Sequence, residues 1–467
     1  KSADTQQRVH IPIYMDQKLR GKRPTYRQDT SDLNLLKIGV LFTLILGGLW
    51  FAYEVFNPEG RFEPLFMPTP TATRTVNSLR QEAEAYFEAG KIYIPDDDDE
   101  TTDDKDAIDV YREVLELHPE DALVRAELSR LLTYSSSLLS TTEERSQRLA
   151  LARQEIERAV QDAPDNSTVQ AIRALVLDWS ATSTAANVEE QQAWLAEAEQ
   201  AANLAINRDP NNSLALAFYA EVLLDQGQKI QALENARLAV EQGPDSMDTH
   251  RVYGTVLEAL GEYRSAIEEF EKAAEINPNL TFLHIRIGVI YRALKVYDTA
   301  LQYFDKAISI NNSNEVQDPL PYIAIAKTYS RMGEFFIAAR NAEKAIQINP
   351  YNANTYGQLG DIYVRSRNYE GAVPVLKCAV EGCTAEENEV ADVAVEPLAL
   401  TNYDVAYYYA RYGSTLAALS RPEQNYCPKA MEILNSLEAS YGSDPTLKDI
   451  INENKEICDL LQDSSAP

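Results

Sequence analysis

Positive charge is scarce in this sequence. Its 467 residues include 43 lysines and arginines against 72 aspartates and glutamates, which gives a formal net charge of −29 at pH 7. Proteins that bind nucleic acid present a basic surface to the phosphate backbone, and so acidic a chain is unsuited to that role. We therefore expect no nucleic-acid partner.

Cysteine and histidine are rare as well, with four of each. The cysteines lack C-x2-C spacing and the histidines lie far from them in the sequence, so a zinc site is not expected. Signatures of catalysis are also missing, because no G-x-S-x-G, Walker, H-E-x-x-H or G-x-G-x-x-G motif occurs. The sequence therefore predicts a protein that is not an enzyme and that carries no metal or cofactor.

Long apolar runs are missing too, with one exception at residues 34–56. Between Lys37 and Glu54 this segment carries no charge. A helix of roughly 20 residues spans the ~30 Å hydrocarbon core of a bilayer. Lys37 is placed to snorkel to one interface, and Trp50 and Tyr53 fit an aromatic belt at the other. We predict a transmembrane helix over 34–56, the alternative being a buried globular helix.

The charges around this segment predict its orientation. Residues 1–33 form a basic tail, whereas acidic residues follow the apolar run. The positive-inside rule then places the tail in the cytoplasm and the rest of the chain in the periplasm or outside the cell. Bulky residues follow the run where cleavage would need small ones, so we expect an uncleaved anchor. Residues 57–75, rich in Pro and Thr, are expected to form an extended linker.

What the sequence has in abundance is a repeat. Pro210, Pro244, Pro278 and Asn312 follow one another at intervals of 34 residues, a period typical of stacked helix–turn–helix units. Small and large residues recur in phase within the units. One unit has Tyr253, Gly254, Ala266, Phe270 and Ala273, and the next has Ile287, Gly288, Ala300, Phe304 and Ala307.

This pattern closely resembles the tetratricopeptide-repeat (TPR) family. The resemblance implies an all-α fold, in which one N-terminal transmembrane helix precedes a right-handed α-solenoid of about nine TPR-like helix pairs with a C-terminal capping helix. We expect degenerate repeats at 76–210, regular repeats at 211–384, and an irregular repeat with the cap at 385–467. In its organisation the chain resembles TPR proteins of the bacterial, single-pass membrane-anchored type.

The resemblance also indicates where a partner would bind. In TPR arrays the first helix of each pair lines the concave face, and family ligands usually lie there. A paired Lys and Asn, by which some members hold a C-terminal carboxylate, is absent, since Ile285 and Val289 lie where it would fall. The expected inner strip is basic and apolar, and it consists of Arg251, Phe282, Ile285, Val289, Arg292, Ile323, Lys327, Arg331 and Arg365.

Such a strip suits a protein partner whose segment carries acidic and apolar groups. The alternatives are a solvated inner face and one filled by the chain's own linker. We expect Arg292 and Arg331 to be exposed, and His250 and His284, at equivalent positions of adjacent repeats, to serve packing rather than metal binding.

The cysteines lie in the last quarter of the chain. Cys427 and Cys458 flank a predicted turn near Ser443, and Cys378 and Cys383 straddle a predicted helix end. Of the three pairings that four cysteines allow, we favour Cys427–Cys458 with Cys378–Cys383, with free thiols as the alternative.

Two functions fit these observations. The first is a non-enzymatic, membrane-anchored scaffold or assembly factor that presents its array outside the cytoplasmic membrane. The second is a structural subunit of a larger membrane complex or surface filament, in which the basic tail and the apolar segment are themselves contact sites. The sequence does not fix the oligomeric state.

Overall fold

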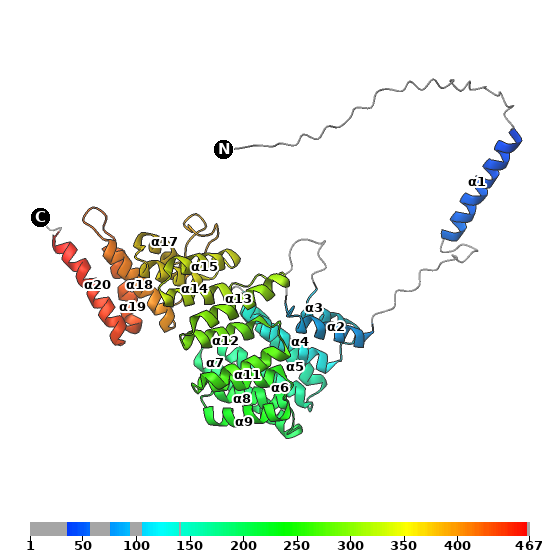
Figure 1. Ribbon diagram of the computed structural model, residues 1–467, viewed down its shortest axis with the longest axis horizontal. Coiled ribbons are helices and arrows are strands. Elements are labelled where there is room, and N and C mark those ends of the chain that lie inside the picture. The colour runs from blue at the N-terminus through cyan, green and yellow to red at the C-terminus, as the bar shows by residue number, and fades with distance from the viewer. Residues whose placement is uncertain (1–34, 57–74, 94–104, 140–141, 465–467) are drawn as a thin grey trace, which may run out of the picture. The chain divides into compact units, whose positions relative to one another are not determined.

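The computed structural model describes residues 35–56, 75–93, 105–139 and 142–464. The chain divides into two units, residues 1–73 and 74–467. The expected basic tail 1–33 and the linker up to residue 74 lie outside the described residues. The first unit therefore contributes one element, helix α1, and the second contributes the helical array (Figure 1).

Helix α1 (Leu35–Phe56) forms over the apolar segment. Among the residues that the structure describes, however, no helix is both long enough and apolar enough to cross a membrane. The expected transmembrane helix is thus not confirmed.

The second unit is an all-helical solenoid in which consecutive helices pack as antiparallel pairs. Over the described residues it has nine pairs, α2–α3 to α18–α19, followed by the terminal helix α20, in agreement with the expected array and cap. Its helices are α2 (Val76–Glu88), α3 (Ala107–Leu117), α4 (Ala122–Ser135), α5 (Thr142–Asp162), α6 (Ser167–Thr184), α7 (Val188–Arg208), α8 (Ser213–Asp225), α9 (Lys229–Gln242), α10 (Met247–Ala259), α11 (Tyr263–Ile276), α12 (Thr281–Ala293), α13 (Tyr297–Ser313), α14 (Leu320–Met332), α15 (Phe335–Ile348), α16 (Ala353–Arg365), α17 (Tyr369–Val380), α18 (Tyr403–Leu419), α19 (Cys427–Tyr441) and α20 (Pro445–Ser464).

Asparagine begins many of these helices. The side chains of Asn166, Asn212 and Asn352 each accept a hydrogen bond from a backbone N–H in the first turn of α6, α8 and α16. Such a cap satisfies a donor that the helix itself cannot, and it stabilises a helix by about 1 kcal/mol. The Pro-x-Asn segments between repeats therefore both end one helix and start the next.

Glycine lets the two helices of a pair approach closely. A Cβ on Gly288 would lie 2.4 Å from the ring of Phe304, and one on Gly360 would lie 2.4 Å from Leu376. Both partners are fully buried. The recurrent small residue followed 16 positions later by a large one is thus the packing contact between the first and second helix of each repeat.

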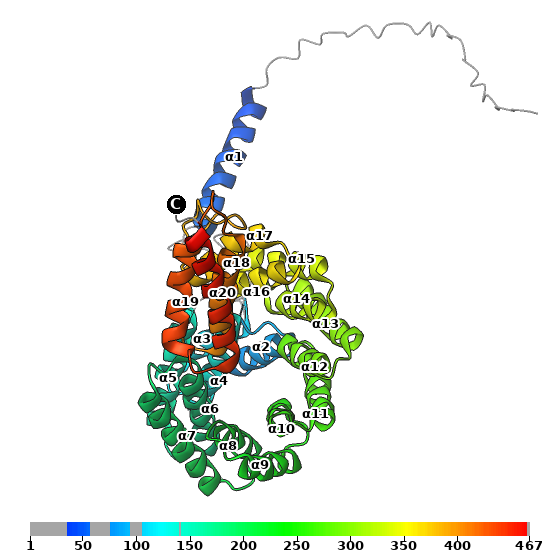
Figure 2. The ribbon, with the colours of Figure 1, turned by 90° about the vertical axis from the view of Figure 1, so that its left-hand side faces the viewer.

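The array curves until its N-terminal repeat meets its middle (Figure 2). The side chain of Asn279, between α11 and α12, donates to the backbone oxygen of Glu88 at 3.0 Å, and Asn314, after α13, donates to that of Ala89 at 2.8 Å. Gly90 has φ +82° and lies so close to Asn279 that a Cβ would approach its backbone oxygen to 2.4 Å. Residues about 190–225 positions apart are therefore in direct contact.

Two disulfides hold the C-terminal end, Cys378–Cys383 and Cys427–Cys458. These are the pairs favoured from the sequence. The first disulfide lies at the end of α17, where the segment that follows this helix folds back beside it. There Cys383 forms an antiparallel bridge with Val395. The second joins the start of α19 to α20 and is fully buried.

We predict that replacing both Cys427 and Cys458 by alanine lowers the free energy of unfolding by about 4 kcal/mol, because this bond closes a long loop. The closure spans 31 positions, whereas that of Cys378–Cys383 spans five, for which about 2 kcal/mol is expected. Thermal unfolding with amide exchange of α20 measures the effect. Unchanged exchange in α20 would contradict the assignment of this bond as the fastening of the cap.

Candidate partner-binding site

The even-numbered helices line the inner side of the curved array. Neighbouring even helices contact one another, as α4 and α6, α6 and α8, and α16 and α18 do. Helices on the concave side of a curved stack are closer together than those on the outside, which accounts for these contacts. On α14, Leu320, Ile323, Lys327 and Arg331 share one face because their spacing of three or four residues matches the helical period.

Six of the nine inner-face residues expected from the sequence line two pockets. Arg292, Lys327, Arg331 and Arg365 line one pocket of about 440 Å³, which we call the basic pocket. Arg251 and Phe282 line another of about 340 Å³, which we call the aromatic pocket. The remaining three, Ile285, Val289 and Ile323, are half-buried on α12 and α14, the helices that both pockets share.

The basic pocket has an excess of positive charge. It contains four cationic side chains from α12, α14 and α16 and two carboxylates, those of Asp361 and Asp404. Asp361 is already engaged, since it accepts from Arg411 at 2.9 Å. Within the described part of the chain no ion pair is formed by Lys327 or Arg331.

Burial and mutual repulsion act on these cations. Burial in the pocket and the nearby guanidinium of Arg292 lower the pKa of Lys327, although part of its side chain reaches solvent. The pKa of Arg292 is lowered to about 10, mainly by burial and to a smaller extent by repulsion from Arg331. A cluster that disfavours its own charge is stabilised by an anion placed among its members. The basic pocket can therefore bind carboxylate or another anionic group.

Two arginines of the expected strip are not free. Arg292 was expected to be exposed, but it is only 9% exposed, and its Nη1 donates to the backbone oxygen of Ala324 at 3.2 Å. Its guanidinium also lies over the ring of Phe304. Arg251 is 6% exposed and is held by two carboxylates. The expectation that Arg292 is exposed was wrong, because its side chain is buried between helices.

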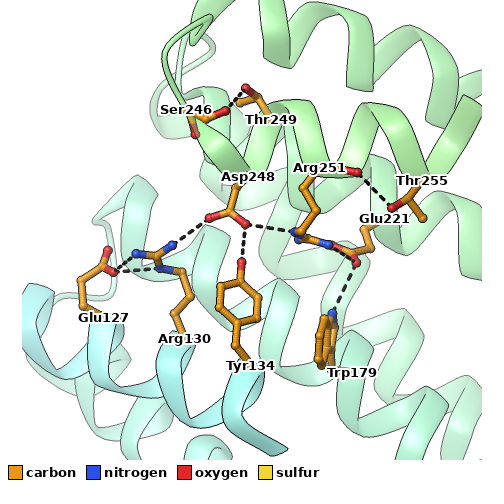
Figure 3. A network of polar contacts seen from close by, with 10 residues as sticks. All are labelled: Glu127, Arg130, Tyr134, Trp179, Glu221, Ser246, Asp248, Thr249, Arg251 and Thr255. Carbon is orange, nitrogen blue, oxygen red and sulfur yellow. Dashed lines mark hydrogen bonds and ion pairs between the residues drawn. The ribbon is translucent and has the colours of Figure 1, made fainter. Parts of the chain in front are cut away.

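The carboxylates around Arg251 form a buried network that joins α4 to α10, shown in Figure 3. Asp248 of α10 accepts from Arg130 at 2.7 Å, from Arg251 at 3.1 Å and from the hydroxyl of Tyr134. We call Arg130, Tyr134 and Asp248 the clasp. Burial alone would raise the pKa of Asp248, but the guanidiniums of Arg130 and Arg251 outweigh it and hold that pKa below its usual value.

The aromatic pocket lies beside the clasp. Its walls include Tyr134, Trp179, Phe270 and Phe282, and the Tyr134 ring lies 5.6 Å from that of Trp179 and 6.2 Å from that of Phe282. Arg251 and Glu221 also line it, but they pair with each other through two bonds of 2.9 Å. The pocket therefore presents apolar surface and no uncompensated charge.

Several lining residues were not anticipated. Tyr403, Tyr407 and Tyr408 of α18 close one side of the basic pocket. They follow the irregular segment after α17, where the 34-residue repeat is interrupted. The repeat therefore could not assign these tyrosines to the inner face, and only their close spacing in the sequence distinguished them. Tyr134 and Trp179 belong to the degenerate repeats. Because these repeats do not keep the 34-residue spacing, the regular repeats could not predict which of their residues face inward.

The two histidines make local contacts. His250 Nδ1 lies 2.6 Å from Glu269 and its Nε2 lies 2.8 Å from the backbone oxygen of Pro244. His284 Nε2 lies 2.8 Å from the backbone oxygen of Pro278. In the described ranges no group of His, Cys, Asp and Glu is arranged to hold a metal ion.

One buried carboxyl next to this region has a strongly raised pKa. Asp178 is 1% exposed, and among the described residues neither of its side-chain oxygens has a hydrogen-bond partner. Burial, with the carboxylates of Asp225 and Glu221, raises its pKa well above the usual value, against the lowering effect of Arg251. A raised carboxyl pKa stabilises the fold below the unfolded-state pKa of about 4, and this stabilisation is lost as pH rises through the folded-state value.

We therefore predict that Asp178→Asn leaves stability unchanged near pH 4 and raises it by about 1–3 kcal/mol at pH 8, where the wild-type carboxyl must otherwise ionise or bind a proton. Thermal unfolding across this pH range measures the difference. Asp305→Asn, at an exposed position of α13, is the matched control and should show no such trend. A constant difference at all pH values would contradict the prediction.

Comparison with known proteins agrees with the repeat pattern. Two family models, both described as tetratricopeptide repeat, match residues 219–281 and 283–314. No curated protein sequence matches the chain.

Solved structures are similar to the chain at low identity and low TM-score. The crystal structure of the APC/C hetero-tetramer Cut9-Hcn1 has TM-score 0.48 and 14% identity, covering 65% of this chain and 52% of that one. Yeast Tom70 has TM-score 0.41 and 15% identity, covering 92% and 79%. A tetratricopeptide repeat protein from Parabacteroides merdae has TM-score 0.42 and 17% identity, covering 60% and 98%.

This chain thus spans about half the length of the Cut9-Hcn1 chain that it matches. At these scores and identities the similarities assign no ligand or partner. What the matched segments do establish is that the all-helical array of this chain contains tetratricopeptide repeats, identified by sequence at residues 219–281 and 283–314.

Proposed function

We propose that the protein is a non-enzymatic interaction scaffold or assembly factor whose inner face binds an acidic segment of a partner protein. The observation that supports this most is the basic pocket, where Lys327 and Arg331 lack ion-pair partners within the described residues of a chain of net charge −29. Tetratricopeptide arrays generally serve protein–protein interaction. Cations held on a concave surface without counter-charges are suited to a ligand that supplies them.

The same arrangement argues against a nucleic-acid ligand. The basic pocket is a local cluster on α12, α14 and α16, not a stripe along the surface, and Asp361 and Asp404 lie within it. A nucleic acid would meet the negative field of the remaining surface, whereas a short acidic peptide reaches only the pocket.

The second candidate function is that of a structural subunit in a larger complex. Its proposed contact sites are the basic tail 1–33 and the apolar helix α1, in which Leu44 and Tyr53 are each 67% exposed. Apolar side chains exposed in this way on one helix favour a helix that is covered by something else. A subunit should co-purify with its complex at a fixed ratio, whereas an assembly factor should dissociate with salt or time.

We propose further that residues 34–56 attach the chain to a bacterial cytoplasmic membrane, with the array in the periplasm or outside the cell. The basic tail before α1 and the acidic residues after it support this orientation. Snorkelling of Lys37 would lengthen the apolar run. Two disulfides suit an oxidising compartment.

The expected result for attachment is that the native protein stays with membranes after extraction at alkaline pH, and that protease added to intact spheroplasts digests the array. Deletion of residues 34–56 should release the array into the soluble fraction. An array protected in intact spheroplasts and digested after lysis would overturn the proposed orientation.

Crosslinking mass spectrometry on protein purified in mild detergent tests the function itself. The neutral amine of a lysine is the nucleophile that attacks an amine-reactive reagent, so the lowered pKa of Lys327 favours its reaction. Crosslinks from Lys327 to an acidic segment of one other protein are expected, and Lys344, exposed on the outer helix α15, serves as the comparison. Crosslinks only from the tail lysines Lys18 and Lys22, or only between copies of the chain, would favour the structural-subunit function.

A further inference from the structure

We infer that the basic pocket and the aromatic pocket are two subsites for a single ligand, which is an extended segment of a partner protein with one aromatic side chain and, about three to five residues away, a pair of carboxylates. This inference rests on the proposed function, because the carboxylates are those that the basic pocket binds. It adds a second anchor to that ligand and a fixed spacing between the two.

The two pockets are built on the same pair of helices. On α12, Phe282 lines the aromatic pocket and Arg292 lines the basic pocket. On α14, Leu320 lines the aromatic pocket, and Lys327 and Arg331 line the basic pocket. One ligand that runs along α12 and α14 therefore passes from one pocket to the other without leaving the inner face.

The helix geometry sets the distance between the subsites. Phe282 and Arg292 are ten positions apart on α12, and Leu320 and Lys327 are seven positions apart on α14. At 1.5 Å per residue these separations are about 15 Å and about 10 Å. An extended chain covers about 3.3 Å per residue, so that about three to five residues bridge the pockets.

The surface between the pockets is apolar. It is formed by Ile285 and Val289 of α12 and Ile323 of α14, all half-buried. Ile285 and Val289 pack against the cluster that contains Phe304 and Ala324, so they do not move aside to create a third pocket. A spacer of small uncharged residues can cross this surface, whereas a charged spacer would lose hydration there without gaining a partner.

The chemistry of the aromatic pocket selects an uncharged ring. Its ionised groups are already neutralised, Arg251 by Glu221 at 2.9 Å and Arg286 by Glu258 at 2.6 Å. A charged side chain would therefore find no free counter-charge. Trp179 and Phe282 offer ring faces and edges to an aromatic side chain, and a space of about 340 Å³ is ample for one.

Fluorescein-labelled peptides test the inference with the full chain. Each peptide has a phenylalanine, a Gly/Ser spacer of one, four or nine residues, and two aspartates, and both orders along the chain are synthesised. The probe is binding measured by fluorescence anisotropy at low salt. We expect one order of the four-residue spacer to bind at least tenfold tighter than the other spacers and than the same peptide with alanine in place of phenylalanine.

Two variants locate the second anchor. Thr255→Phe places a ring in the aromatic pocket, and Ser137→Phe does so from its exposed rim, where the fold is less affected. Circular dichroism checks that each variant is folded. A folded variant should bind the four-residue-spacer peptide only as weakly as the wild-type protein binds the alanine peptide. Neither should change binding of the alanine peptide, which depends on the basic pocket alone.

The outcomes separate the inference from the proposed function. Binding that requires the aspartates and the basic pocket, but is the same for every spacer and for alanine, would overturn the two-subsite inference and leave the proposed function standing. If no peptide binds more tightly than a control with asparagines in place of aspartates, the proposed function fails as well.

Discussion

Replacing Lys327 and Arg331 together by glutamate is expected to weaken binding of the four-residue-spacer peptide about a thousandfold. Each cation is free to make a charge-assisted hydrogen bond worth about 1.5–3 kcal/mol, so the pair accounts for about 4 kcal/mol or more. A thousandfold loss corresponds to that energy, at about 1.4 kcal/mol for each factor of ten. Fluorescence anisotropy with the labelled peptide gives the affinity directly.

The two positions are chosen because both side chains reach solvent, so their replacement should leave the fold intact. Arg292 is left unchanged, since its burial against Phe304 means that a charge reversal there would test stability instead. The control is Arg264→Glu with Arg340→Glu, which makes the same change in net charge on the outer helices α11 and α15. An equal loss in both variants would show that long-range charge, not the pocket, governs binding.

Removing the carboxylate of the clasp is expected to lower the free energy of unfolding by about 4 kcal/mol. Asp248→Ala leaves Arg130 and Arg251 in a buried site with one counter-charge fewer, and breaking a buried ion pair in this way costs about 3–5 kcal/mol. Tyr134 loses the acceptor of its hydroxyl as well. Thermal or urea unfolding measures the change.

The effect should also depend on pH. Since the pKa of Asp248 is lowered in the fold, its contribution is present above the unfolded-state pKa of about 4 and is lost as pH falls through the folded-state value. Asp245→Ala, at an exposed position just before α10, is the matched control and should be almost neutral. A loss below about 1 kcal/mol at pH 7 would mean that the contact between α4 and α10 contributes little to stability.

The repeat phase explains why much of the inner face could be numbered from the sequence. Lys327, Arg331 and Arg365 lie in one pocket because the 34-residue period keeps the first helix of each regular repeat in the same orientation. A helical stripe fixes which residues face inward. It does not fix how far a long side chain extends, and so it could not show that Arg292 folds back onto Ala324.

The return of the N-terminal repeat onto the middle of the array depends on curvature. Curvature accumulates from small rotations between many repeats, and the degenerate repeats carry no clear phase from which to add them. One signal was available in retrospect. The interval after Asn312 is longer than 34 residues, and the longer α13 that results carries Asn314 to the backbone of Ala89.

The pairing of the cysteines rests on simpler physics. Cys427 and Cys458 lie on antiparallel neighbours around a short turn, and such positions come together whatever the curvature of the rest. By contrast, the tyrosines of α18 reach the basic pocket only because the segment between α17 and α18 returns over the end of α17, where the backbone N–H of Leu398 donates to Ala379. No local pattern reports a return of that kind.

The clasp also changes how the array would respond to a pull on its ends. In an open stack of repeats, tension passes through every repeat in turn, and the array lengthens gradually as the force rises. Here Arg130 and Asp248 join points 118 residues apart, so the load crosses from α4 to α10 and the helices between them are slack. Extension would first meet a stiff array and then, once the clasp and the bonds of Asn279 and Asn314 to the N-terminal repeat break, a sudden gain in length. A scaffold with such a fastening keeps its shape under small forces and yields in one step under large ones.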